Sequence, residues 1–535
     1  MRILAPLLAL LALPAAPQTP PPSTQDLEEA VRRFVAVLAT AMDNAAERPD
    51  LDAAIYRGAI PAMLRPLDPH SVFFDREQFE QLREMERSVT KGFGTIVSIL
   101  PGRVIILQTM PGSPSQKAGL APGDEILAIN NIPLAFLDLD QLIQLLSYSR
   151  QREAQLLVRR QGEARPVQLT LSPAELDSPS VDRSFLLEPD IGYIRISSFD
   201  AKTAGALRET VQKLGGERLR GLVLDLRDNQ GGVVQSAVAA AALFLEPGSV
   251  LFSARGRNTP VEEVKVPEGF TPYRFKLAVL VNGRTASAAE LFTGAIQDND
   301  RGAVLGEPTF GKALVQSIYR ISMGAGLALT TGRYYTPSGR LIQRPWDPSF
   351  DEYLTYTLRL DPTSARARSE ADLRYTDAGR KVYGGGGIEP DHIVPGPVEG
   401  FNPTRFGREL YARQVFDNYA QKFSAEGDTR IVGQAKDRRY VRRGFEVDDA
   451  MIADFRRFLE REQRIRIDEQ AFAKDLEFIR TMIKYRIDFA LFGIEEARRT
   501  LIAKDPQTQL AISLFPEAER LTALARARAN GGGQR

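Results

Sequence analysis

Short apolar runs alternate with helical segments between residues 190 and 397 of this chain. The runs are compact and strongly apolar, which is typical of buried strands, and the segments between them have helical apolar spacing. The expected strands cover residues 192–196, 221–226, 277–281 and 303–305, and the expected helices cover 201–214, 235–245 and 286–297. Alternation of strands and helices predicts a layered α/β core.

Composition narrows the class of protein and of partner. A length of 535 residues, with 43% hydrophobic and 26% charged residues, indicates a globular chain of three or four domains. The 69 basic and 68 acidic side chains leave a formal charge of +1, which argues against a nucleic acid as the main partner. The chain has no cysteine, so disulfides, thiol nucleophiles and cysteine-rich metal sites are excluded. We expect no metal and no other cofactor.

The N-terminus has the order of regions found in a secretory signal. Arg2 precedes an apolar run over residues 3–13, and small residues follow at 14–16. We therefore expect residues 1–16 to be a cleaved signal peptide and the protein to be exported, to a periplasm or outside the cell. The alternative is an uncleaved membrane anchor, although the run is short for a bilayer span. No later stretch is apolar enough to span a membrane, so none is expected after signal removal.

Residues 17–24 form a proline-rich linker, and residues 25–86 are expected to be a helical region. Apolar residues in this region recur at steps of three or four, which gives one helical stripe. The stripe consists of Leu27, Val31, Phe34, Leu38 and Met42. A proline-containing turn at residues 67–71 interrupts the helical pattern.

Residues 87–173 change to short strands separated by Pro-Gly turns. The sequence GSPSQKAGLAPGDEILAINN at 112–131, followed by a helix and a last strand, resembles a PDZ domain. The resemblance places the family's carboxylate-binding loop at Lys91, Gly92, Phe93 and Gly94. In that loop, backbone N–H groups hold the terminal carboxylate of a peptide that adds to the sheet as a strand.

Residues 399–528 are again polar and helical, and residues 529–535 are expected to be a disordered tail. One apolar stripe stands out in this C-terminal extension. Its members are Phe472, Leu476, Ile479, Ile483, Ile487 and Leu491. The stripe is expected either to pack inside the chain or to form a homodimer interface.

The chemistry-bearing residues lie between residues 282 and 316. Ser287 follows a buried strand and begins a helix, where backbone N–H groups point outward and suit a nucleophile beside an anion-stabilising site. A serine needs a base, and Lys312 precedes apolar residues that would bury it and lower its pKa. The chain has only two histidines, and both His70 and His392 are expected to be structural.

Five further positions support this pair. Gln316 lies four residues after Lys312 on an expected strand, so both would share a face and the amide could orient the lysine. Glu290 lies one helical turn after Ser287 and would support the site. An oxyanion hole would combine the N–H of Ala288 with one from the glycines Gly231 and Gly232.

These segments together resemble the carboxyl-terminal processing peptidases, or tail-specific proteases. The family's pattern Asn-x-x-(Ser/Thr)-Ala-Ser-Ala-x-Glu matches residues 282–290, with Ala289 where serine is common. Its pattern Gly-Glu-x-Thr-x-Gly-Lys-x-x-Val-Gln matches residues 306–316, with Ala313 where glycine is common. Its pattern Leu-Asp-Leu-Arg-x-Asn-x-Gly-Gly matches residues 224–232, with Gln230 where proline is frequent, which leaves the oxyanion glycine open. Residues 67–71, 334–339 and 387–391 also match.

The resemblance implies a multidomain α/β protein with a helical N-terminal region, a PDZ domain, a crotonase-like peptidase core at 180–398 and a helical C-terminal extension. It implies that Ser287 is the nucleophile, Lys312 the general base and Gln316 the residue that positions the lysine. Protein substrates would be recognised by their C-termini, with an adaptor protein and a homodimer as further expected partners. The alternative is a catalytically idle PDZ scaffold on the same fold. A Ser-His-Asp protease is disfavoured, because the chain lacks a Gly-x-Ser-Gly-Gly loop.

Overall fold

A computed structural model describes most of the chain. It covers residues 23–531 apart from 48, 87–88, 101, 111, 122–123, 150–151, 161–162, 164, 178, 259–260, 347–368, 395–402 and 427–440. The expected signal peptide therefore lies outside the described residues. Within the described residues, we find no helix that combines the length and the apolar character needed to cross a membrane. The chain divides into two compact units, Met1–Leu67 and Asp68–Arg535.

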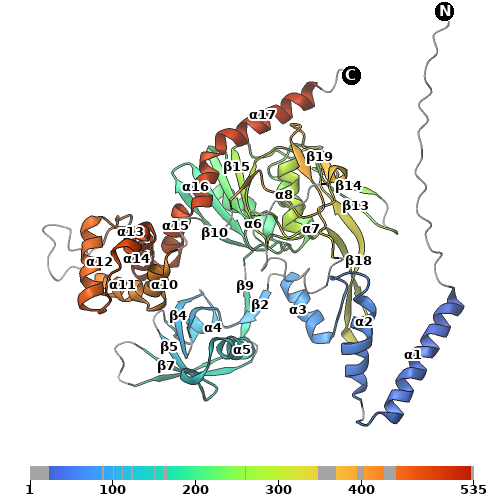
Figure 1. The fold of residues 1–535 in the computed structure, drawn as a ribbon, viewed down its shortest axis with the longest axis horizontal. Coiled ribbons are helices and arrows are strands. Elements are labelled where there is room, and N and C mark those ends of the chain that lie inside the picture. The colour runs from blue at the N-terminus through green and yellow to red at the C-terminus, as the bar shows by residue number, and fades with distance from the viewer. Residues whose placement is uncertain are drawn as a thin grey trace, which may run out of the picture. The chain divides into compact units, whose positions relative to one another are not determined.

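The first unit is helical (Figure 1). Helix α1 (Thr24–Asn44) begins with a capping box in which Ser23 and Asp26 exchange side-chain and backbone hydrogen bonds. A π-helical segment (Ala53–Ala59) and α2 (Ile60–Leu64) follow. No residue of α1 is buried, so its expected apolar stripe is largely exposed.

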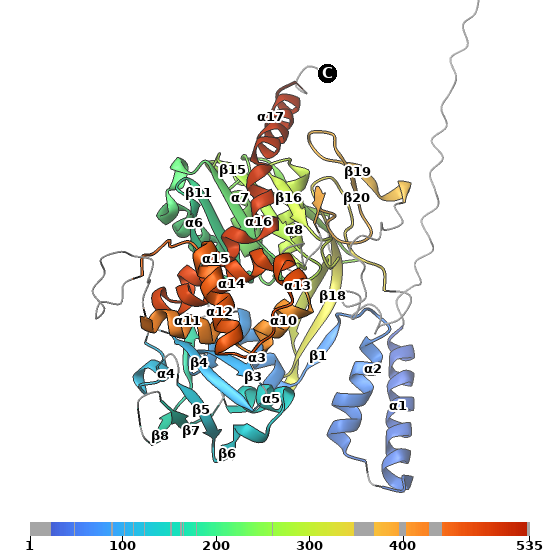
Figure 2. The ribbon, with the colours of Figure 1, turned by 60° about the vertical axis from the view of Figure 1, so that its left-hand side comes forward.

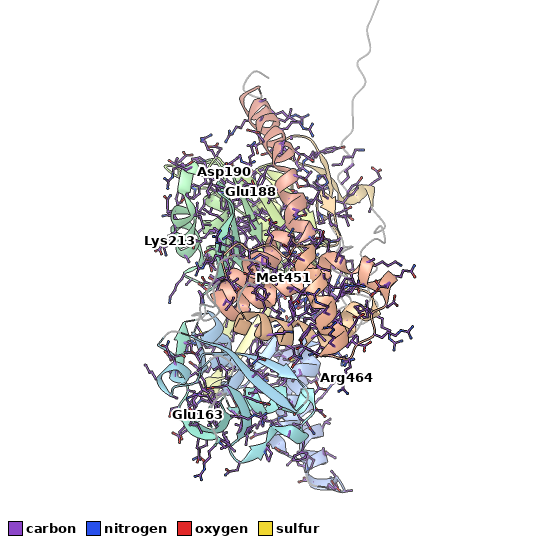
Figure 3. The ribbon with its side chains drawn as sticks, turned by 90° about the vertical axis from the view of Figure 1, so that its left-hand side faces the viewer. Glu163, Glu188, Asp190, Lys213, Met451 and Arg464 are labelled. Atoms are coloured by element: carbon purple, nitrogen blue, oxygen red, sulfur yellow. The ribbon has the colours of Figure 1, made fainter. Side chains whose placement is uncertain are left out.

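The second unit is built on a six-stranded sheet, with strand order β10-β11-β12-β15-β16-β21. The strands are β10 (Val181–Glu188), β11 (Ile191–Ile196), β12 (Gly221–Asp225), β15 (Lys276–Val281), β16 (Ala303–Gly306) and β21 (His392–Ile393). All pairs are parallel except β10 with β11. Glu188 ends β10 and Asp190 lies in the turn before β11 (Figure 3), and Arg220 forms ion pairs with both. The expected α/β core is confirmed.

One face of this sheet is covered by the helices that the alternating pattern predicts. They are α6 (Thr203–Leu214), α7 (Val234–Ala242) and α8 (Ala288–Asp298). Leu222 and Leu224 of β12 point into this layer, together with Leu207 of α6 and Phe292 of α8. Successive strand side chains point to opposite faces, so the residues between these leucines must be covered from the other side.

That other face is covered by the last two helices of the chain, α16 (Pro506–Ser513) and α17 (Phe515–Gly531). Val223 of β12 packs in a cluster with Ala511 and Phe515. Figures 1 and 2 show α16 and α17 running across the strands of this sheet. Helix α17 reaches into the range expected to be a disordered tail, and residues 532–535 lie outside the described residues.

A second sheet has the order β1-β18-β13-β14, with β17 also paired to β18. The strands are β1 (Val72–Phe74), β18 (Gly326–Tyr335), β13 (Val250–Arg255), β14 (Glu262–Lys265) and β17 (Leu314–Arg320). Strand β1 lies within residues 25–86, which were expected to be helical, so that expectation is wrong for this segment. Its residues form a strand because they pair with β18. Helix α3 (Arg76–Glu86) follows β1, and a small hairpin joins β19 (Leu373–Tyr375) to β20 (Lys381–Tyr383).

Residues 95–171 form a separate sheet in the order β3-β4-β5-β7-β8, with β6 on β5. Its elements are β3 (Thr95–Leu100), β4 (Arg103–Thr109), α4 (Pro114–Lys117), β5 (Glu125–Ile129), β6 (Ile132–Pro133), α5 (Leu139–Ser149), β7 (Ala154–Arg159) and β8 (Val167–Leu171). Val104, Ile126 and Leu142 share one apolar core. Strands β2 (Val89–Gly92) and β9 (Ala174–Asp177) pair where the chain enters and leaves this sheet.

The C-terminal extension has its own helical core. Its helices are α10 (Arg405–Ala412), α11 (Val415–Glu426), α12 (Asp449–Arg461), α13 (Glu469–Lys474), α14 (Leu476–Phe492) and α15 (Ile494–Lys504). Met451 of α12, visible in Figure 3, lies in this core. Ile479, Ile483 and Ile487 are fully buried there, whereas Leu491 is partly exposed. The apolar stripe was expected either inside the chain or at a homodimer interface. In the structure it packs inside the chain, so it does not provide a surface for a second copy.

Candidate active site

Three loops meet at one edge of the six-stranded sheet. They follow β12, β15 and β16, and they contain residues 226–233, 282–287 and 307–313. Because parallel strands place their carboxyl ends at the same edge, their following loops are neighbours, and this edge is where open α/β sheets bind ligands. Thr285 ties the loops together: its Oγ1 donates to the Leu226 carbonyl at 2.8 Å, and its own carbonyl accepts from Phe310 N–H at 2.9 Å.

Ser287 is the residue that precedes α8, and its backbone is strained. Its φ of 57° and ψ of −122° lie in a region that side-chain-bearing residues rarely adopt. The Ser287 N–H donates to Oε2 of Glu290 at 2.8 Å. Every residue of α8 is buried, whereas Ser287 is partly exposed. The rigid helix thus holds a serine at the surface of the site.

Glu290 joins the serine segment to the lysine segment. Its Oε2 also accepts the backbone N–H of Lys312 at 2.8 Å, so the backbone nitrogens of Ser287 and Lys312 bind the same oxygen. Its Oε1 accepts from Gly311 N–H at 2.7 Å and from Thr309 Oγ1 at 2.5 Å. Burial raises the pKa of Glu290, while these hydrogen bonds oppose that rise.

Lys312 is carried into an apolar wall, since Ala313 and Leu314 directly after it are buried. Burial lowers the pKa of its amine, because an ammonium loses solvation there, and the charges of Glu290 and Asp68 oppose the change only in part. A lysine in such surroundings can be neutral and accept a proton.

Gln316 lies in β17, but its amide contacts a different partner from the one expected. Its Nε2 donates to the backbone carbonyl of His70 at 2.6 Å. No hydrogen bond joins it to Lys312 within the part of the chain that the structure describes. Lys312 precedes β17, and the strand has a register shift between Val315 and Gln316, so simple alternation does not relate the two side chains.

Of the two glycines after β12, Gly231 lies against Ser287, whereas Gly232 lies against Phe199. A Cβ on Gly231 would come within 2.9 Å of the Ser287 Cβ and of the Ala288 nitrogen. The Gly231 N–H already donates to Oδ1 of Asn229 at 2.8 Å, so it is not free to bind an oxyanion. Among the described residues, the N–H groups of Ala288 and Gly232 have no backbone or side-chain acceptor. This pair therefore fits an anion site better than Gly231 does.

A groove of about 380 Å³ runs beside the sheet of residues 95–171. It is lined by Gly92, Phe93 and Gly94, by β3 residues such as Val97, and by α5 residues such as Leu146. Strand β3 is an edge strand, so its outer backbone groups can pair with an added strand. Within the described residues, the N–H groups of Phe93 and Gly94 donate to no acceptor, while their carbonyls accept from Ser115 and Met110. Lys91 itself belongs to β2 and pairs with β9.

Comparison with known proteins matches two parts of the chain to known families. A family model described as Peptidase family S41 matches residues 190–349, and one described as PDZ domain matches residues 105–160. The carboxyl-terminal-processing protease of Synechocystis sp. is 34% identical over 298 residues, covering 54% of this chain and 68% of that protein. The chain belongs to the carboxyl-terminal-processing peptidase family.

A second relative of this chain is the chloroplastic carboxyl-terminal-processing peptidase 2 of Arabidopsis thaliana. It is 32% identical over 330 residues, covering 57% of this chain and 64% of that protein. This peptidase thus spans about two thirds of the length of these curated relatives. Among solved structures, the photosystem II D1 C-terminal processing protease has 22% identity and a TM-score of 0.37, with 72% of this chain and 95% of that chain covered.

Sequence reasoning recognised residues 67–71 only as a family match and did not place this turn beside Lys312. The charge of Lys312 acts on the His70 imidazole, and the expectation that His70 is structural stays a prediction. Burial, with a smaller contribution from that charge, lowers the pKa of His70 to about 4. The available signal was an Asp with a Ser three residues later, a pattern typical of a side-chain-capped turn. His392, by contrast, contacts Glu517 of α17. The described residues contain no cluster of side chains suited to a metal ion.

Proposed function

We propose that this protein is an endopeptidase that cleaves protein substrates through an acyl-enzyme, with Ser287 as nucleophile and Lys312 as general base. One observation carries the proposal: Glu290 binds the backbone N–H groups of both residues with one carboxylate oxygen, while burial lowers the pKa of Lys312. A serine and a neutral amine held on one support are the minimum that serine/lysine catalysis requires.

The chemical steps follow from these positions. The Ser287 Oγ attacks the scissile carbonyl and forms a C–O bond, while its proton passes to the neutral Lys312 amine. The tetrahedral oxyanion accepts hydrogen bonds from the N–H groups of Ala288 and Gly232. Lys312 then returns the proton to the leaving amine as the C–N bond breaks. In the second half, Lys312 takes a proton from water as the water oxygen attacks the acyl carbon. The C–O bond to Ser287 then breaks, and Lys312 returns the proton to the Ser287 Oγ, which releases the acid product and restores the enzyme.

Glu290 and Gln316 are proposed as positioning residues in this scheme. Glu290 fixes the two backbone segments that carry the reacting groups. Gln316 holds the turn at residue 70 beside the lysine segment, through its bond to the His70 carbonyl. Neither needs to exchange a proton with the substrate.

The groove beside β3 is proposed as the site that recognises substrate C-termini. A peptide would add as a strand to β3, with its carboxylate at the free N–H groups of Phe93 and Gly94. The apolar lining favours an apolar last side chain, because residues such as Ile126, Ile143 and Leu146 surround the cavity. The matched PDZ family model supports this role.

Location and assembly are finer proposals. Export to a periplasm or to the outside of the cell rests on the sequence of residues 1–16. A homodimer, if formed, would use the apolar side chains of α1, such as Val31 and Phe34, which are about half exposed, rather than the buried stripe of α14. Light scattering of Phe34→Glu against the natural protein tests this assembly. An adaptor protein is proposed only by the resemblance.

Labelling with a fluorophosphonate, together with cleavage of an unstructured protein, tests the activity. The natural protein should be labelled at Ser287, and both Ser287→Ala and Lys312→Ala should lose labelling and cleavage without unfolding. The double variant should be no slower than either single variant, because both groups serve one step. Ser322→Ala, which removes an exposed serine elsewhere, is the matched control. A folded natural protein without labelling or cleavage would instead support the idle scaffold.

A further inference from the structure

The turn Asp68–Ser71 is a preformed, buried element next to the catalytic segment. Oδ1 of Asp68 accepts the backbone N–H groups of His70 and Ser71, at 2.7 and 2.8 Å. Its Oδ2 accepts from the Ser71 hydroxyl at 2.6 Å. Asp68 and Ser71 are both buried. Three short hydrogen bonds to one carboxylate fix the position of its charge, since the side chain cannot rotate without breaking them.

The same turn is attached to two paired strands of the active site. The His70 carbonyl accepts from Gln316 of β17, and the Ser71 hydroxyl accepts from Thr330 N–H of β18 at 3.2 Å. Gln316 and Thr330 are register partners across these strands. The turn therefore contacts one residue pair of the β17–β18 hairpin, Gln316 and Thr330, and Gln316 lies four residues after Lys312. Strand β1, directly after the turn, extends the attachment by pairing with β18.

The charged and titratable groups that act on Lys312 and on its neighbour His70 come from three elements. Asp68 and His70 come from the turn, and Glu290 comes from α8. Arg344, from the segment after β18, acts on His70. Both carboxylates act to raise the pKa of Lys312, against the larger effect of burial. The pKa of about 4 for His70 leaves that imidazole neutral above pH 5, so it brings no positive charge to the lysine.

Glu290 and Asp68 differ in what else they do. Glu290 accepts hydrogen bonds from the backbone of both catalytic segments, so its replacement would disturb their geometry. The hydrogen bonds of Asp68 stay within its own turn, so its influence on Lys312 is through space. A proton that leaves Ser287 for Lys312 creates an ammonium in a site that otherwise disfavours positive charge, and a fixed negative charge nearby stabilises that state.

The geometry points to Asp68 as a positioning residue of the peptidase: the turn Asp68–Ser71 holds a fixed carboxylate that stabilises the ammonium form of Lys312 during proton transfer. This inference rests on the proposed function of Ser287 and Lys312. It assigns to residues 68–71 an electrostatic role in the reaction beyond closing a turn.

The rate of fluorophosphonate labelling, measured from pH 5 to pH 10, tests the inference. In the natural protein the rate should rise as Lys312 loses its proton. Asp68→Asn removes the charge but keeps an oxygen for the two turn N–H groups. We expect it to lower the plateau rate and to move the rising limb to lower pH by about one unit, because the ammonium loses a favourable neighbour.

Ser71→Ala is the matched control, because it removes the hydroxyl bonded to Asp68 without changing any charge. Ser71→Ala can change the plateau rate of labelling through geometry, but it should leave the pH of the rising limb unchanged. If Asp68→Asn does not fold, Asp68→Thr supplies a second neutral residue whose hydroxyl can cap the turn. If the rising limb of the pH profile stays at the same pH in a folded variant that lacks the Asp68 charge, the proposed role of Asp68 is overturned. Failure of the natural protein to label would overturn the proposed function itself, so the two failures are distinguishable.

Discussion

At the scale of single residues, the site depends on a serine held in a strained backbone conformation. A residue with φ of 57° and ψ of −122° costs about 1 to 3 kcal/mol and persists only where its surroundings impose it. Here the surroundings are Glu290, which accepts the Ser287 N–H, and the buried helix α8. The strained backbone lowers the stability of the fold and holds the Ser287 hydroxyl in a fixed, accessible position.

This strain predicts a difference between two inactive variants. Ser287→Gly should be more stable than Ser287→Ala by about 1 kcal/mol, because glycine adopts positive φ without a Cβ clash. Urea denaturation of both variants measures the difference in free energy of unfolding. Equal midpoints, with equal slopes, would contradict the view that the backbone at Ser287 is strained.

The half-buried His70 predicts a loss of stability in acid. The unfolded chain protonates this imidazole near pH 6.5, whereas the folded protein keeps it neutral until about pH 4. Protons therefore bind the unfolded state preferentially in this range, and the free energy of unfolding should fall as the pH drops from about 6.5 to about 4.

Replacing this histidine by a residue that does not titrate should remove that part of the pH dependence. His70→Gln should lose less stability than the natural protein between pH 7.5 and pH 4.5, as measured by urea denaturation at both values. The comparison at pH 7.5, where the imidazole is neutral in both states, corrects for any change in packing. Parallel losses in the two proteins would show that His70 is not the titrating group.

At the scale of elements, edge strand β3 and the loop before it line the groove that we propose binds substrate C-termini. Within the described residues the N–H groups of Phe93 and Gly94 have no acceptor, and a terminal carboxylate would supply two charged oxygens. Amidation of a substrate's C-terminus should therefore raise KM at least several-fold, as measured with matched acid and amide peptides. Equal cleavage of the two forms would contradict carboxylate recognition.

A pair of glycines in the same domain provides a matched test of this loop. Gly94 has φ of 74°, and a Cβ there would come within 2.3 Å of the Ser113 Cβ. Gly119 has a similar φ of 83° with nothing within 4 Å of its would-be Cβ. Gly94→Ala should weaken binding of acid peptides, whereas Gly119→Ala should cost backbone strain alone. Isothermal titration of one acid peptide against both variants distinguishes them.

At the scale of the whole molecule, the C-terminal helices complete the catalytic core. Phe515 is 1% exposed and lies against Gly221 of β12, where a Cβ would come within 2.4 Å of the ring. Arg227 strengthens the same attachment, through ion pairs with Asp225 and with Asp505 at the start of α16. Loss of this layer would expose the apolar face of the central sheet to water.

Truncation of this side chain tests the role of the layer. Phe515→Ala should reduce the free energy of unfolding by about 3 to 5 kcal/mol, because it opens a cavity under a central strand. Leu524→Ala, on the exposed side of the same helix at 45% exposure, should change it by no more than about 0.5 kcal/mol. Thermal or urea unfolding of both variants checks this. A small effect at Phe515 would mean that the helix is not part of the core.

The central strands were predictable from the sequence alone, whereas the roles of Ser287 and Lys312 stay predictions. Buried parallel strands are continuous apolar runs, so β11, β12, β15 and β16 are visible as local patterns without any knowledge of their neighbours. The helix start at Ser287, the apolar residues after Lys312 and the family motifs predicted that these two residues act together. The groove beside β3 was likewise marked by a local sequence pattern.

Contacts between distant segments were decided only by the tertiary structure. An apolar stripe indicates that its side chains are buried, but it does not indicate which surface covers them. The sequence therefore could not decide whether the α14 stripe packs against its own chain or against a second copy. Neither the cover of the sheet by α16 and α17 nor the attachment of His70 and Ser71 to a hairpin more than 240 residues later has a local signature. These contacts form because burial of apolar surface and saturation of buried polar groups are satisfied over the whole fold at once, not within any one segment.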